Sequence, residues 1–150
     1  MLIKLLANQI AENWETLQPA ILGSLNPAVS MDQVKLEALY ENLIADKVQC
    51  WSIVRRASKA QIEIMAFMTT TIIEDPGTGG LSLLIYSLFG IRPLHEDIDL
   101  WLDSCVGLRK YAAAHDCEKI VGYTNSSSVL QTVQEHLGGQ AEFTFFSITL

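Results

Sequence analysis

The stretch Leu81–Trp101, LSLLIYSLFGIRPLHEDIDLW, points most directly to ligand chemistry. A nearly continuous apolar run, a turn and an amphipathic pattern predict a buried strand, a short turn and a helix. At such a junction, main-chain N–H groups at the helix N-terminus can bind a phosphate. Glycines in the turn let the phosphate approach the main chain closely. Here the turn offers only Gly90, then Arg92, then Pro93, which has no N–H, and then several acids. The position suits a phosphate site, whereas the residue types favour a structural turn with acids at a helix start.

Other reactive side chains lack the spacing of a known catalytic or metal site. The three cysteines form no CxxC motif and no zinc-like cluster with histidine, which predicts reduced thiols in a cytosolic protein (Cys50, Cys105 and Cys117). The segment DPGTGG lacks the Lys-Ser/Thr of a P-loop and reads as a hairpin loop. Ser126–Ser128 reads as a helix N-cap, and His95 and His136 have no recognisable catalytic partner.

Composition limits the classes of protein to which the chain can belong. Its 150 residues predict a single domain, residues 1–150, with a substantial core. Hydrophobic residues make up 49% of the chain, but no apolar run reaches the roughly 18–20 residues that span a bilayer, so we expect no membrane partner. A net charge of −7 argues against nucleic acid, which requires clustered basic residues. The apolar excess favours a protein partner or a homo-oligomer.

Periodicity predicts a mixed, mostly antiparallel α+β sheet flanked by helices, in the order β α α β β β α β α β. The first helix, marked by Ile10, Trp14, Leu17 and Ile21, is expected to break or kink at Pro19. A capping box of Ser30 and Gln33 begins the second helix. The expected strands are Leu2–Leu6, Cys50–Ala57, Gln61–Glu74, Leu81–Gly90, Lys119–Asn125 and Ala141–Leu150; the two later helices are Ile98–His115 and Ser126–Leu137.

This order resembles the GNAT fold, that of the Gcn5-related N-acetyltransferases, over nearly the whole chain. The closest local pieces are LSLLIYSLFG with the helix Ile98–His115, and IVGYTNSSSVLQTVQEHLGG. In that family the turn between these first two pieces carries a Q/R-x-x-G-x-G/A signature, whose amides hold the pyrophosphate of coenzyme A. The signature is degenerate here, and the helix after Asn125 lacks the tyrosine that GNAT enzymes often place there.

The resemblance implies candidate residues if the protein is active. Acetyl-CoA would contact Leu88, Gly90, Arg92 and Asn125, Glu63 or Glu74 would act as the base, and Tyr123 would act as the acid. The residues themselves favour plainer roles. Glu63 alternates with two isoleucines and is expected to face water, and Glu74 adjoins the hairpin loop as a turn carboxylate. Tyr123 is expected to be half-buried with its hydroxyl at a rim.

Two functions remain open, with a generic ligand-binding regulatory module as a third. In the first, the chain has lost acetyl-CoA catalysis and acts as a protein-binding or structural component. It is similar to small GNAT-like proteins encoded by tailed bacteriophages near their virion genes, which implies the host cytoplasm or a virion as its location. In the second, it is an active acetyl-CoA-dependent N-acetyltransferase that acts on an amine of a small molecule or peptide.

Overall fold

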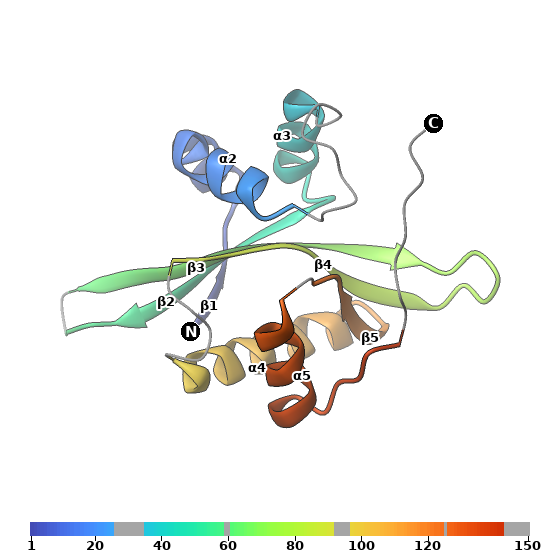
Figure 1. Ribbon diagram of the computed structural model, residues 1–150. Helices are drawn as coiled ribbons and strands as arrows, with labels where there is room; N and C mark the ends of the chain where they lie inside the picture. The colour runs from blue at the N-terminus through green and yellow to red at the C-terminus, as the bar shows by residue number, and fades with distance from the viewer. Residues whose placement is uncertain (26–34, 59–60, 92–96, 125, 143–150) are drawn as a thin grey trace.

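A five-stranded sheet with the strand order β1-β2-β3-β4-β5 forms the centre of the molecule (Figure 1). The computed structural model describes residues 1–25, 35–58, 61–91, 97–124 and 126–142. The strands are β1 (Leu2–Lys4), β2 (Gln49–Arg56), β3 (Ile62–Glu74), β4 (Leu81–Gly90) and β5 (Cys117–Gly122). The first three pairings are antiparallel and β4–β5 is parallel. The predicted mixed, mostly antiparallel α+β sheet is confirmed.

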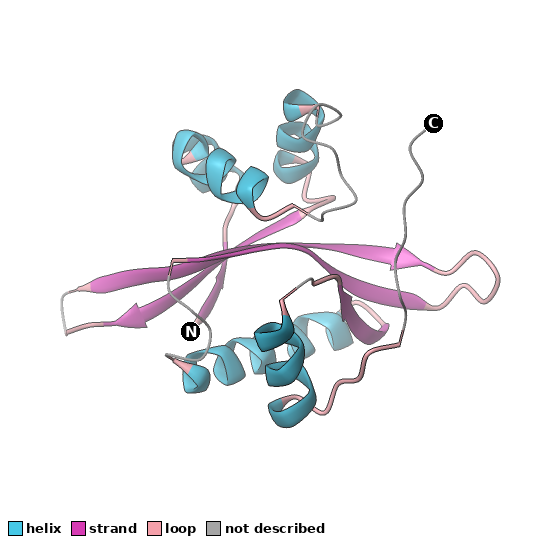
Figure 2. Ribbon diagram, in the orientation of Figure 1, coloured by secondary structure: helices cyan, strands magenta, loops and turns pink. Residues whose placement is uncertain are grey.

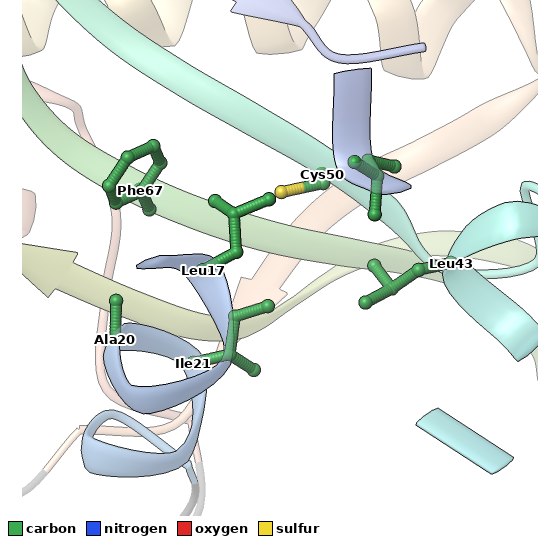
Figure 3. Close-up of a cluster of buried hydrophobic side chains, with 7 residues drawn as sticks. Leu17, Ala20, Ile21, Leu43, Cys50 and Phe67 are labelled. Atoms are coloured by element: carbon green, nitrogen blue, oxygen red, sulfur yellow. The ribbon is translucent and has the colours of Figure 1, made fainter. Parts of the chain in front are cut away.

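Helices cover both faces of this sheet (Figures 1 and 2). One face carries α1 (Ala7–Glu12), α2 (Trp14–Gly23) and α3 (Leu36–Ile44), and the other side carries α4 (Ile98–Ala114) and α5 (Ser127–His136). Apolar side chains of α1–α3 pack on Cys50 and Phe67 of the sheet (Figure 3). On the opposite face, Leu108 and Ala112 of α4 pack on Trp51, Met68 and Leu83. None of the helices in the described ranges is long and apolar enough to cross a membrane.

The β3–β4 connection is the hairpin loop that its composition predicts. The Asp75 carboxylate accepts hydrogen bonds from the main-chain N–H groups of Gly77 and Thr78, each at 2.9 Å. Gly79 has a φ of 72°, a left-handed conformation that glycine adopts without strain. At the start of α5, the Ser126 hydroxyl accepts a hydrogen bond from the Val129 N–H, which confirms the predicted N-cap.

The prediction of a break at Pro19 is wrong. The helix is interrupted at Asn13, so it forms two helices and the observed order begins β α α α. The Asn13 side chain donates a hydrogen bond of 2.8 Å to the Gln9 carbonyl, a local bond that competes with regular helix. Pro19 lies within α2. Proline has no N–H to donate to the main-chain carbonyl of Glu15, four residues earlier, but both residues are exposed, so this carbonyl can bind water instead.

Two further expectations concern residues outside the described part of the chain. These are the Ser30–Gln33 capping box and all but the first two residues of the terminal strand Ala141–Leu150. The strand predicted at Lys119–Asn125 begins earlier, at Cys117, and ends at Gly122. Tyr123 and Thr124 therefore follow the strand, and Asn125 is outside the described residues.

Candidate functional site

The pairing between the parallel strands β4 and β5 ends before β4 itself does. Their pairing runs from Leu81–Cys117 to Ile85–Gly122, and within the described strands β5 offers no partner beyond that point. β4 continues for the five residues Tyr86–Gly90, of which Ser87–Gly90 stay paired with β3 on their other edge. We call this divergence of β4 from the chain after β5 the fork. Main-chain N–H and C=O groups on such a free strand edge are ready to pair with another chain or with a ligand.

A β-bulge lies at the inner end of the fork. Thr70 of β3 pairs with Ile85 and Thr69 pairs with Ser87, so Tyr86 is an extra residue in β4. A bulge bends its strand, leaves the extra residue outside the regular ladder and re-aims a side chain. Because the bulge coincides with the last β4–β5 pair, the strand changes direction where the free edge begins.

Two tyrosines stand at this inner end. Ile85 and Gly122 are the last pair of the parallel register, so the next residues on the two segments are Tyr86 and Tyr123. The Tyr123 side chain is 51% exposed and Tyr86 is partly buried. Sequence reasoning named Tyr123 but missed Tyr86, because a bulge in an apolar strand has no signal in residue type.

The predicted cofactor-binding residues are divided by the structure. Leu88 and Gly90 lie on the free edge of β4. The Leu88 side chain packs against the cluster beneath α4, so Leu88 can offer its main chain to a ligand. Gly90 is exposed at the outer end of the fork, opposite Ala66. Arg92 and Asn125 lie outside the described residues.

The expectation that Glu63 simply faces water is wrong. Its carboxylate accepts a hydrogen bond of 2.8 Å from Arg55 Nη2, and its side chain is 36% exposed. The neighbouring Ile62 and Ile64 are more exposed, at 59% and 44%. The reason is that the β2–β3 hairpin extends beyond the helices (Figure 1), so its apolar positions are left uncovered while Arg55 engages the carboxylate.

The two candidate bases lie apart from each other and from the fork. Glu63 and Glu74 are eleven residues apart on the same strand, which is about 36 Å at the rise of an extended chain. Tyr86 lies opposite Thr69 and Thr70. Along β3, Glu74 is therefore about 13 Å from the inner end of the fork and Glu63 about 20 Å. Glu74 is exposed beside the hairpin loop, in the position expected of a turn carboxylate.

The start of α4 is tied to the β2–β3 hairpin by the same arginine. Arg55 Nη1 lies 3.0 Å from Asp97 Oδ2, and Asp97 is the N-cap residue of α4. The Asp97 side chain makes no capping hydrogen bond to the helix. Hydrogen bonding to Glu63 raises the pKa of the Arg55 guanidinium, which keeps its charge between the two carboxylates. The charge of Asp97, one of the acids at this junction, is thus partly neutralised.

Thiol and metal chemistry have no support in the described residues. Burial raises the pKa of Cys50 to about 12 and also raises the pKa values of Cys105 and Cys117. These thiols are free and stay protonated at neutral pH, which makes them poor nucleophiles and ligands. Within the described ranges, no group of three or more His, Cys, Asp or Glu side chains is placed to hold a metal ion.

Comparison with known proteins identifies the fold. No family model and no curated protein matches the chain. An aminoglycoside acetyltransferase from an uncultured soil metagenomic sample is similar, with a TM-score of 0.68, 12% identity and coverage of 100% of this chain and 95% of that one. Glucosamine-6-phosphate N-acetyltransferase from Arabidopsis thaliana gives a TM-score of 0.62, 14% identity, and coverage of 99% and 97%.

A third similar structure is a predicted acetyltransferase from Clostridium acetobutylicum with acetyl-CoA. Its TM-score is 0.66 at 16% identity, with coverage of 99% of this chain and 95% of that one. Likeness at these identities concerns the fold alone. The chain has the α+β fold of the GNAT acetyltransferases along its length, as its element order predicts.

Proposed function

We propose that the protein binds an acyl-coenzyme A along the free edge of β4 and transfers its acyl group to an amine. The observation that carries this proposal is the fork, where β4 continues for five residues beyond its last pair with β5. The pantetheine arm contains amide groups, which can pair with a free strand edge as a peptide does, without particular side chains. Similarity to acetyltransferase structures, one of them with acetyl-CoA, supports this choice of ligand.

The residues at the fork suit particular parts of this task. The main chain of Leu88 and Gly90 would hold the arm, and a main-chain N–H at the Tyr86 bulge can donate to a carbonyl oxygen. The Tyr123 hydroxyl can hold or release a proton at the inner end. Bound acetyl-CoA supplies the thioester that an amine attacks. Since Glu63 and Glu74 lie far along β3, we expect the amine to enter as the free base or to lose its proton to water.

The test is titration calorimetry of the full chain with acetyl-CoA, coenzyme A and pantetheine, followed by amide hydrogen exchange with and without coenzyme A. We expect micromolar binding of coenzyme A, roughly −8 kcal/mol. Exchange should slow at Leu88–Gly90, while Leu81–Ile85, which already pairs on both edges, serves as the internal control. No binding at millimolar ligand, or protection confined to another part of the chain, would refute the proposal.

Activity is tested by thiol release from acetyl-CoA in the presence of a panel of amines. Tyr123→Phe and Tyr86→Phe remove the two hydroxyls at the inner end while keeping their rings. If either hydroxyl protonates the leaving thiolate, its variant should lose kcat about 10²-fold or more with little change in coenzyme A affinity. Full activity in the double variant would exclude both tyrosines from proton transfer.

A second candidate function is a non-catalytic protein that acts through its surface. It is favoured by the uncovered apolar residues of the β2–β3 hairpin and its neighbour, Ile62, Ile64 and Ile91, of which Ile91 is 54% exposed. A role in a bacteriophage particle is the narrower form of this proposal. Light scattering after size exclusion tests it: a closed ring or larger assembly that Ile62→Ser/Ile64→Ser dissolves would favour it, and a monomer that binds coenzyme A would count against it.

A further inference from the structure

One segment of the chain itself occupies part of the fork. Leu25, two residues after α2, forms an isolated antiparallel β-bridge with Ser87 of β4. The other edge of Ser87 is taken by Thr69 of β3. Leu25 therefore lies on the edge of β4 that β5 has left, two residues beyond the last β4–β5 pair. The inner end of the fork is closed by the protein's own backbone.

Leu25 is anchored from behind. Its side chain packs against the cluster of α1–α3. The preceding Ser24 donates its hydroxyl to the carbonyls of Ala20 and Ile21, at 2.9 and 3.1 Å, which fixes the end of α2. Displacing Leu25 would therefore also disturb the end of a packed helix.

Ser87, on the other side of the bridge, is held equally firmly. Its side chain is buried and its Oγ lies 2.6 Å from Thr69 Oγ, itself fully buried. A hydrogen bond between two buried hydroxyls is costly to break, because each group would be left without a partner away from water. Moving either Leu25 or Ser87 out of the bridge would therefore break buried contacts and cost free energy.

The bridge leaves a limited length of free edge. Leu88, Phe89 and Gly90 remain on the outer side of Ser87, toward the connection to α4. Three extended residues span about 10 Å. A ligand arm that enters from the α4 side and pairs along this edge meets Leu25 at its inner end.

We propose that Leu25 limits the length of the acyl group that the protein accepts, so that acetyl is taken and long acyl chains are refused. The inference rests on the proposed function, because it concerns the same edge of β4. An arm that lies with its phosphates toward α4 brings its thioester end to Ser87. A long acyl chain attached there would have to displace Leu25 and break the anchoring contacts behind it, whereas an acetyl group would not.

The test is calorimetry of the full chain with coenzyme A, acetyl-CoA and octanoyl-CoA, for the unmodified protein and for Leu25→Gly. Leu22→Ala is the matched control, since Leu22 lies three residues earlier in α2 and is not bridged to β4. We expect the unmodified protein and Leu22→Ala to bind octanoyl-CoA about 10-fold or more weaker than acetyl-CoA, the size of effect that a closed pocket exerts on added methylenes. Leu25→Gly should bind the two within about 3-fold, by the same reasoning.

Amide hydrogen exchange without ligand gives a second readout. Exchange at Tyr86–Leu88 should be faster in Leu25→Gly than in the unmodified protein and unchanged in Leu22→Ala; identical exchange in Leu25→Gly would overturn the inference. Equal affinity of the unmodified protein for acetyl-CoA and octanoyl-CoA would overturn it too, while leaving the proposed function intact. If neither the unmodified protein nor Leu25→Gly binds coenzyme A, the proposed function is refuted and with it the role of Leu25. Leu25→Ala replaces Leu25→Gly if circular dichroism shows that the glycine variant is unfolded.

Discussion

Arg55→Ala removes a side chain that forms two ion pairs, one with Glu63 across the β2–β3 hairpin and one with Asp97 at the start of α4. Arg55 Nη2 lies 2.8 Å from the Glu63 carboxylate and Nη1 lies 3.0 Å from that of Asp97. Without the guanidinium, Glu63 and Asp97 each lose their ion pair with Arg55, and the start of α4 loses its link to the hairpin. We therefore expect Arg55→Ala to lower the free energy of unfolding and to loosen the first turn of α4.

The expected magnitude is modest because these side chains are partly exposed. The exposed fractions are 40% for Arg55, 36% for Glu63 and 24% for Asp97. Two charges 3 Å apart would attract by about 1.4 kcal/mol in water and several-fold more in a protein interior, and exposed pairs retain only about 0.2–1 kcal/mol of this. The freed Asp97 carboxylate can cap α4, which returns about 0.5–1 kcal/mol. The net loss should be about 0.5 kcal/mol, or about 1–2 °C in Tm.

Urea unfolding followed by circular dichroism measures this loss, with Arg56→Ala, at the neighbouring exposed arginine, as the control. Adding Asp97→Asn to Arg55→Ala should recover part of the loss, because it removes a carboxylate that Arg55 no longer neutralises. Raising the salt to about 1 M should shrink the difference between Arg55→Ala and the unmodified protein. A free energy of unfolding for Arg55→Ala equal to that of Arg56→Ala would refute the reasoning.

Two further predictions concern buried groups. Burial raises the pKa of Cys50 to about 12 in the folded protein, against its ordinary 9.0 in the unfolded chain, so unfolding releases a proton at pH values above 9. The free energy of unfolding should therefore fall between about pH 8 and about pH 10, and urea unfolding of Cys50→Ala should show a smaller fall over the same interval. Trp51 Nε1 donates a 2.8 Å hydrogen bond to Thr70 Oγ1 beneath α4, and Trp51→Phe should cost about 2 kcal/mol in the same assay. A loss as small as that of an exposed substitution such as Arg56→Ala would show that Thr70 re-pairs without cost.

The secondary structure was predictable where one period persists over a long segment. The apolar run of β4 and the alternation in β3 are strand signals that local sequence carries, and the DPGTGG composition carries its hairpin. The prediction for the first helix was wrong about which residue interrupts it. Pro19 is the stronger helix breaker by type, but it lies on an exposed face. The interruption falls at Asn13, whose φ of −111° and ψ of 13° are not helical and whose side chain binds the Gln9 carbonyl.

The candidate site was predictable only in part, because it depends on register. The sequence indicates that β4 ends near a turn suited to a phosphate, and it includes Leu88 and Gly90. Nothing in residue type shows that β5 stops at Gly122 while β4 continues, or that Tyr86 is a bulge. The same holds for Arg55, whose partners lie on a neighbouring strand and at the start of a distant helix.

The two carboxylates that residue type suggested as bases illustrate why a site must be sought across strands. Residues on one extended strand separate by about 3.3 Å per residue, so Glu63 and Glu74 cannot converge on one reacting atom. The residues that border the inner end of the fork come from three separate segments: Leu25 after α2, Tyr86 in β4 and Tyr123 after β5. Of these, only the two tyrosines carry a titratable hydroxyl. Proton transfer by described residues at the fork would therefore depend on phenols and water, and its pH dependence should follow the amine substrate rather than a carboxylate.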